Sequence, residues 1–349
     1  MSLKEASMSI LDRLFHREGI SEKSAPGSEQ VSDAIERIAR LSPQLRLAER
    51  YQERLAPAVR ASLDYVGALV DDMPPAREAS ASAWTTDPYI QIFFATPEDV
   101  PRALSHSTEV RAHFAANPLA NEAFAVLGMA MTERLTIGVQ QHGSAARTDV
   151  QRTTVNFSDH RARVCASTEP ALREEIVRHV MDQLVLAGLE RIGAEALRRD
   201  ELEKERALLK TRLALLQRQG SGMSAVLGAQ PSSGLVELAR LQAQMEENDA
   251  ELARLGLATE AIDRRLETIA DVLNSPAEHL HVLKRELRLD RMNVIVENGP
   301  ARESTTIELR LASVPETAGA MRAFALVQFA RSDLLPAPSM VDEARKFLI

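Results

Sequence analysis

The spacing of apolar residues between Leu238 and Leu273 predicts a long helix that packs along one narrow face. Apolar residues recur there at alternating intervals of three and four, which is the heptad pattern of a coiled coil. A helix over this stretch would be about 54 Å long, and its narrow stripe requires a partner helix. The stripe, in which only Asn248 and Thr259 are polar, consists of Leu238, Leu241, Met245, Asn248, Leu252, Leu255, Thr259, Ile262, Leu266, Ile269 and Leu273.

A second helical stretch, Ala171 to Arg218, is the natural partner, because it lacks proline and carries apolar residues at helical intervals. Charged residues at Glu195, Arg199 and Arg206 interrupt its apolar stripe and predict a shift in heptad register near its middle. The Gly- and Ser-rich residues 219–234 are predicted to end the helix and to form the tip of a hairpin.

The distribution of charge favours an antiparallel hairpin over a parallel homodimer. Residues 204–218 carry five basic side chains and one acidic, whereas residues 237–251 carry five acidic and one basic. An antiparallel hairpin places these two stretches side by side, with opposite charges facing each other. A parallel homodimer would place each stretch beside its own copy, where like charges repel.

The first third of the chain has a helical pattern. Residues 1–30 are predicted to be a flexible segment with a short amphipathic helix, which docks on the body or, less favoured, lies on a membrane surface. Residues 31–131 form a predicted helical layer, in which Pro57 is expected to kink or divide a helix. Asn121 to Met131 is the last helix expected in this layer.

After this layer the period of the apolar pattern changes to two, which is typical of strands. Three antiparallel strands are predicted within residues 132–168, with Ser158 to His160 as one of the turns. The pattern returns within residues 288–335, whereas Val282 to Leu289 has a helical composition. Residues 321–330 suit either a strand or a buried helix, and the strand is preferred.

These patterns together predict an α+β fold. It consists of an N-terminal helical layer and a small antiparallel β-sheet made from residues 132–168 and 288–335. The sheet is split by an inserted antiparallel coiled-coil hairpin, residues 169–287, with its tip at 219–234.

Composition narrows the environment and the class of partner. Apolar residues make up 45% of the 349 residues, but aromatic residues only 4%, so the core is expected to be mostly aliphatic. The formal charge of -8 argues against nucleic-acid binding. The single cysteine, Cys165, excludes an internal disulfide, and no apolar run reaches the length of a membrane span. We therefore expect a cytoplasmic protein, with homo-oligomer formation left open.

The chain contains none of the short motifs that mark nucleotide, metal or nucleophile chemistry, so no catalytic residue, metal or cofactor is predicted. His279 and His281 have the closest approach to metal-ligand spacing, but a solvated helix start is the better interpretation. Cys165 is interpreted as a small buried apolar residue rather than as a nucleophile.

Two hypotheses for function follow. The first is a non-enzymatic adaptor or assembly protein whose hairpin tip contacts a protein partner through Met223, Val226 and Leu227. For these three residues, folding back to close the end of the coiled coil is the favoured interpretation, and partner contact is the alternative. The alternative function is an enzyme or small-ligand-binding protein, with a site where the helical layer meets the sheet. Its candidate residues are Asp159, His160, Arg161 and Arg163.

Overall fold

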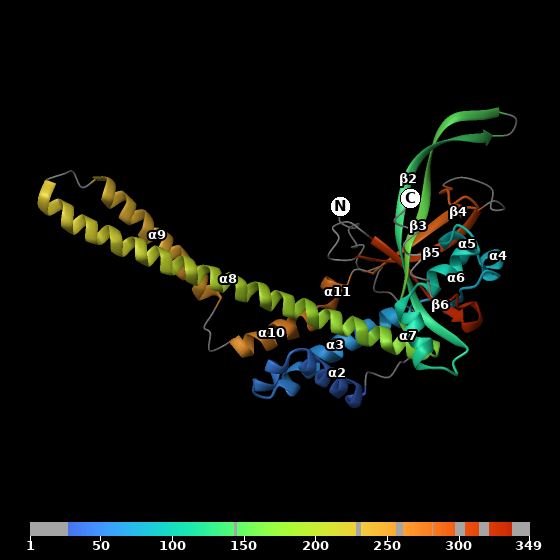
Figure 1. The fold of residues 1–349 in the computed structure, drawn as a ribbon, viewed down its shortest axis with the longest axis horizontal. Coiled ribbons are helices and arrows are strands. Elements are labelled where there is room, and N and C mark those ends of the chain that lie inside the picture. Colours follow the sequence, from blue (N-terminus) through green and yellow to red (C-terminus); the bar gives the residue numbers. More distant parts are fainter. Residues whose placement is uncertain are drawn as a thin grey trace, which may run out of the picture.

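The protein is an α+β body from which two arms project, one helical and one made of two β-strands (Figure 1). The computed structural model describes residues 27–142, 145–227, 232–255, 261–280, 282–296, 304–313 and 321–336. The amphipathic helix predicted near the N-terminus lies outside these residues. None of the helices in the described ranges is long and apolar enough to cross a membrane.

The N-terminal layer begins with two α-helices and a short 3-10 helix: α2 (Ser28–Leu41), η1 (Pro43–Leu47) and α3 (Tyr51–Asp71). Four short helices follow them: α4 (Ala83–Thr86), α5 (Pro88–Phe93), α6 (Asp99–Ser105) and α7 (Thr108–Ala116). Asp87 caps α5 by accepting a hydrogen bond from the Tyr89 amide at 2.8 Å. Pro57 does not divide α3, which continues through it.

The sheet has the strand order β3-β2-β6-β5-β4, and all neighbours in this order are antiparallel. The two-residue β1 pairs in parallel with the end of β6. The preferred interpretation of residues 321–330 as a strand is confirmed. The strands are β1 (Arg77–Glu78), β2 (Glu122–His142), β3 (Ala145–Ala166), β4 (Val282–Asp290), β5 (Ser304–Ser313) and β6 (Met321–Ala330).

Two predicted helices are strands in the structure. In the predicted helix from Asn121 to Met131, every residue from Glu122 onward belongs to β2. The stretch from Val282 to Leu289, which has a helical composition, lies in β4. In both stretches, alternate residues face the core of the sheet, as Ala125 and Leu127 do in β2. Burial against neighbouring strands outweighs the helical composition of these stretches.

The predicted turn at Ser158 to His160 is instead a bulge within one continuous strand. Gly128 of β2 pairs with Arg161, and Ala130 pairs with Ser158, so two residues of β3 lie opposite Met129 alone. Asp159 takes a φ of 49°, which a short polar side chain tolerates better than most. The residues from Ser158 to His160, which favour turns, therefore form a β-bulge, and β3 continues without a turn.

The insertion between β3 and β4 is helical, as predicted, but its divisions differ. The predicted tip at 219–234 does not end the first helix at Gln219, because α8 (Glu169–Leu227) continues through the first half of that range. The second arm is not one helix but two, α9 (Ser232–Arg254) and α10 (Ala261–Asn274), followed by the short α11 (Pro276–His279). Residues 256–260, which include Thr259, lie outside the described part.

Two cores lie on opposite faces of the sheet. One joins α5, α6 and α7 to the side chains of alternate strand residues, such as Leu127 and Phe329. The other joins α2, α3, α10 and the first half of α8 to the opposite face, where Leu326 is buried. The described body is thus three layers, with the sheet between the short helices and a bundle of long ones (Figure 1).

The two arms leave this body in different directions (Figure 1). Beyond the sheet, β2 and β3 continue as a two-stranded ribbon. The sequence had predicted short strands in this region, but not a long ribbon. Leu135 on this ribbon is 67% exposed. The helical arm consists of the second half of α8 together with α9, which packs along it.

Candidate functional site

The helical arm is held together by a thin apolar contact with ion pairs beside it. Leu202 and Leu209 of α8 and Leu241 of α9 are buried between the two helices. Arg198 Nη2 lies 2.7 Å from Glu251 Oε2, and Arg206 Nε lies 2.7 Å from Asp249 Oδ1. The residue numbers rise along α8 as they fall along α9, so the two helices run antiparallel.

A polar residue is buried in this contact. The Asn248 side chain donates from Nδ2 to the Leu202 carbonyl oxygen at 3.1 Å and to Glu205 Oε2 at 3.3 Å. Its Oδ1 has no hydrogen-bond partner among the described residues. A polar residue in a helix seam restricts the register in which the two helices can pair.

The predicted tip residues Met223, Val226 and Leu227 lie in the last two turns of α8. Their side chains lie outside the described part of the chain. The arm places this end of α8 far from the body (Figure 1). Contact between these residues and a partner stays a prediction.

The four residues of the predicted polar site do not come together. Asp159 accepts hydrogen bonds at 2.8 Å from Arg161 Nε and from Arg322 Nη1. These bonds, first that from Arg161 and then that from Arg322, lower the pKa of the Asp159 carboxyl group. Arg163 instead pairs with Glu109 of α7.

His160 contacts a third set of neighbours. Its Nε2 donates to the Phe93 carbonyl oxygen at 2.7 Å, and its ring stacks on Phe94 with 4.5 Å between centroids. Burial lowers the pKa of His160. These contacts support a structural role for His160 in attaching α5 to β3, because both its ring face and its Nε2 are engaged.

An open groove of about 560 Å³ lies where the end of β3 meets α7 and the first turns of α8. Sequence reasoning missed it, because its walls come from three separate segments. Of the predicted polar residues, Arg163 is the one that lines it. The lining residues are Glu109, Arg163, Val164, Cys165, Ala166, Ala171, Glu174, Glu175, Arg178 and His179.

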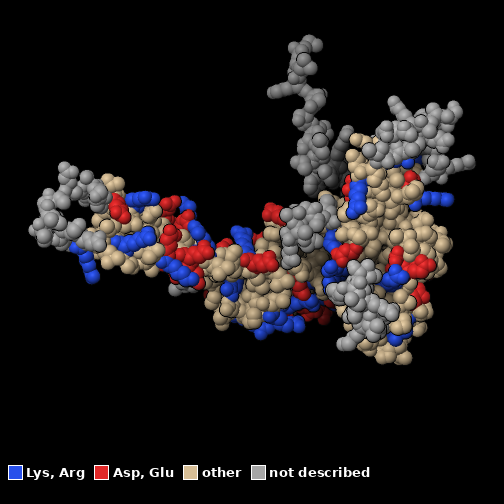
Figure 2. Space-filling view, turned by 45° about the horizontal axis from the view of Figure 1, so that its top comes forward, with Lys and Arg blue, Asp and Glu red and all other residues tan. Residues whose placement is uncertain are grey.

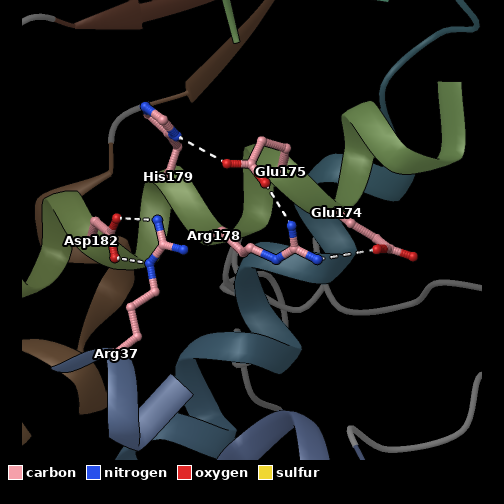
Figure 3. Close-up of polar contacts among 6 residues, drawn as sticks. All are labelled: Arg37, Glu174, Glu175, Arg178, His179 and Asp182. Carbon is pink, nitrogen blue, oxygen red and sulfur yellow. Dashed lines mark hydrogen bonds and ion pairs between the residues drawn. The ribbon is translucent and has the colours of Figure 1, made fainter. Parts of the chain in front are cut away.

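The charges in the groove are already matched, as Figure 3 shows for its α8 side. Arg178 Nη1 lies 2.6 Å from Glu175 Oε2, and its Nη2 lies 3.4 Å from Glu174 Oε2. His179 Nδ1 lies 3.9 Å from Glu175 Oε1. With Arg163 also paired, neither arginine of the groove is left to attract an anion.

Next to the groove, Arg37 of α2 holds α8 with a two-point ion pair (Figure 3). Its Nε and Nη2 donate to the two carboxylate oxygens of Asp182 at 2.7 and 2.6 Å. Bidentate pairs of this kind fix orientation as well as distance. This contact anchors the first half of α8 to the bundle.

Neither metal nor thiol chemistry has support from the described residues. Among them, no group of three His, Cys, Asp or Glu side chains could hold a metal ion. His279 is exposed at the end of α11, and His281 lies outside the described ranges. Burial raises the pKa of Cys165 to about 12, so its thiol stays protonated near neutral pH.

Acidic and basic side chains are interspersed along the helical arm (Figure 2). The arm surface is therefore charged without carrying a single sign over its length. No known protein family, curated protein or solved structure matches the chain.

Proposed function

We propose that this chain is a cytoplasmic, non-enzymatic adaptor or assembly protein. Its helical arm, the coiled-coil hairpin of α8 and α9, presents its distal end to a protein partner. The observation that carries this proposal is the length of α8, 59 residues, of which only the first half packs into the bundle. At 1.5 Å per residue the helix is about 88 Å long.

The small share of the arm in the two cores supports a role in presenting its distal end to a partner. Every ordered residue costs conformational entropy, and the distal half of the arm contributes little to either core of the body. The ion pairs from Arg198 and Arg206 to α9 hold the two helices alongside each other. A long, ordered projection of this kind suits contact with another macromolecule rather than binding of a small substrate.

The test replaces residues 219–234 with a short Gly/Ser turn and compares partners in the native cells. A photo-cross-linking residue at Met223 or Leu227 is expected to capture one recurring protein. The same probe at Leu47, which is 72% exposed on the body, serves as the matched control. If the same proteins co-purify with and without the tip, or if the probe at Leu47 captures the same protein as the tip probes, the proposal is wrong.

The groove beside α8 favours a second candidate, a small-ligand-binding protein. Its volume of about 560 Å³ is within the range of ligand sites, and Arg163 lies in its wall. Native mass spectrometry of the protein purified from its own cells should then show a bound small molecule. Ala171→Trp, which places a large side chain in the groove, should remove that molecule, and a protein purified without any bound mass would contradict this candidate.

A further inference from the structure

The outer face of α8 carries a row of leucines that α9 does not cover. Leu186, Leu197, Leu208 and Leu215 are between 39% and 68% exposed, whereas Leu202 and Leu209 on the inner face are 2% and 5% exposed. At 100° per residue, the four exposed leucines fall within about 40° of one another around the helix axis. They form one straight row about 44 Å long, which we call the outer stripe.

The outer stripe lies opposite the inner contact. Leu202 and Leu209, which pack on α9, project about 100° to 160° away from the outer leucines. Gly193 lies beside the outer stripe, and a Cβ added there would meet no atom within 4 Å. A row of exposed leucines with open space beside it is a surface that another helix can pack against.

Charge along the outer face changes sign from one half to the other. Glu190, Asp200 and Glu201 lie near the stripe on the half closer to the body, and Lys204 and Arg212 lie near it on the half closer to the tip. Neither Lys204 nor Arg212 forms an ion pair with another residue in the described part of the chain. The inner ion pairs to α9 use Arg198 and Arg206 instead.

We infer that the outer stripe is a self-association surface, on which α8 of a second copy packs antiparallel around a two-fold axis near residues 202 and 203. Leu197 then lies opposite Leu208 of the second copy. Leu186 lies within about one turn of the second copy's Leu215. A two-fold contact of this kind makes each pairing twice, because the same surface serves both copies.

The charges select the antiparallel arrangement. In that arrangement Lys204 faces Glu201 of the second copy, and Arg212 lies within a turn of the second copy's Glu190. A parallel pair would place Lys204 beside its own copy and Glu201 beside its own copy, and like charges in contact destabilise such a pair. This surface is separate from the tip, so the inference does not rest on the proposed function.

The first test measures mass in solution by sedimentation over a range of protein concentrations. The full chain is expected to dimerise, and Leu197→Asp with Leu208→Asp should weaken dimerisation at least tenfold without changing the helical circular dichroism signal. Leu119→Asp, at a 95% exposed position on the body, is the matched control and should leave the dimer intact. A monomer at all concentrations, or a dimer that survives the double change, overturns the inference.

The second test determines direction in a Cys165→Ser background. A mixture of Leu197→Cys chains and Leu208→Cys chains should form a disulfide-linked dimer on mild oxidation, whereas Leu197→Cys chains alone should not. Lys204→Glu should weaken the dimer, and Lys204→Glu with Glu201→Lys should restore it. A disulfide between two Leu197→Cys chains would show a parallel pair and would contradict the inference. A cross-link between residues 1–26 and the outer stripe of the same chain would show that this segment covers the stripe, and would also contradict the inference.

Discussion

α9 and α10 carry two halves of one apolar stripe, but they pack in different surroundings. In α10, Leu266, Ile269 and Leu273 are fully buried among α3 and α8. In α9, Leu252 is only half-buried, and α8 is the helix of the described chain that packs along it. The same spacing of apolar residues therefore stabilises the bundle more than the arm, because the number of neighbouring helices determines how much surface is buried.

The close packing of α10 extends to the backbone of α8. A Cβ added at Gly188 would lie 3.3 Å from Ile269 Cγ1 and 3.4 Å from the Ile269 Cα. Glycine thus permits α8 and α10 to approach more closely here than two larger residues would. The arm, with exposed flanks and one contact face, is expected to open locally while the bundle stays folded.

The largest effect is expected from Ile269→Ala in the bundle. It leaves a cavity between α3, α8 and α10 and should lower the free energy of unfolding by about 3 to 4 kcal/mol. Denaturation followed by circular dichroism at 222 nm measures this loss. Val236→Ala, at a 71% exposed position on α9, is the control and should change stability by less than about 0.5 kcal/mol. Equal losses in both variants would remove the distinction between buried and exposed positions.

A smaller effect is expected from Leu202→Ala in the arm. The leucine is buried, but two helices can close over the cavity more easily than three, so we expect a loss of about 2 kcal/mol. Hydrogen exchange should increase in α9 and the second half of α8, and remain unchanged in α10. If exchange in α10 increases equally, the arm and the bundle unfold as one unit and the comparison fails.

Acid should weaken the body while sparing the arm. The pKa of His160 is lower in the folded protein than in the unfolded chain, so the unfolded chain takes up a proton first as pH falls below about 6.5. Stability present at pH 7 should therefore decline toward pH 5. His160→Gln should reduce this dependence, although His113, whose pKa burial also lowers, keeps a part of it.

Denaturation at pH 7 and pH 5 measures this difference for the original chain and the variant. Hydrogen exchange in α9 should not respond to the same change in pH, because no histidine lies in α9. An identical pH dependence in His160→Gln would show that His160 is protonated equally in the folded and unfolded chain.

The smallest effect is expected from Asn248→Leu, which makes the arm resemble the bundle. The change removes a buried amide whose Oδ1 has no hydrogen-bond partner among the described residues. It also removes the hydrogen bonds that Asn248 donates to the Leu202 carbonyl oxygen and to Glu205. We expect the arm to gain between 0 and about 1 kcal/mol, with slower exchange in α9. A loss above about 1 kcal/mol would mean that the two donated bonds matter more than the unpaired oxygen.

The errors of sequence interpretation fall where local patterns compete. Residues 122–131 and 282–289 have helical composition and become strands, because the sheet buries their alternate side chains. The groove could not be predicted, because Glu109, Arg163 and Arg178 meet only when α7, β3 and α8 come together. Of the predicted polar residues, Asp159 and Arg161 are neighbours in sequence and do meet, but around Arg322 of a distant strand.

The sequence by itself determined the α+β class, the helical insertion between two groups of strands, and the antiparallel direction of the arm. Periodicity and charge are local properties, and they specify which face of an element is buried. Only the tertiary structure decided what covers each face: one helix for Leu241, the helices α3 and α8 for Ile269, and no described element for Leu197. That assignment depends on residues far apart in the chain, and no local pattern contains it.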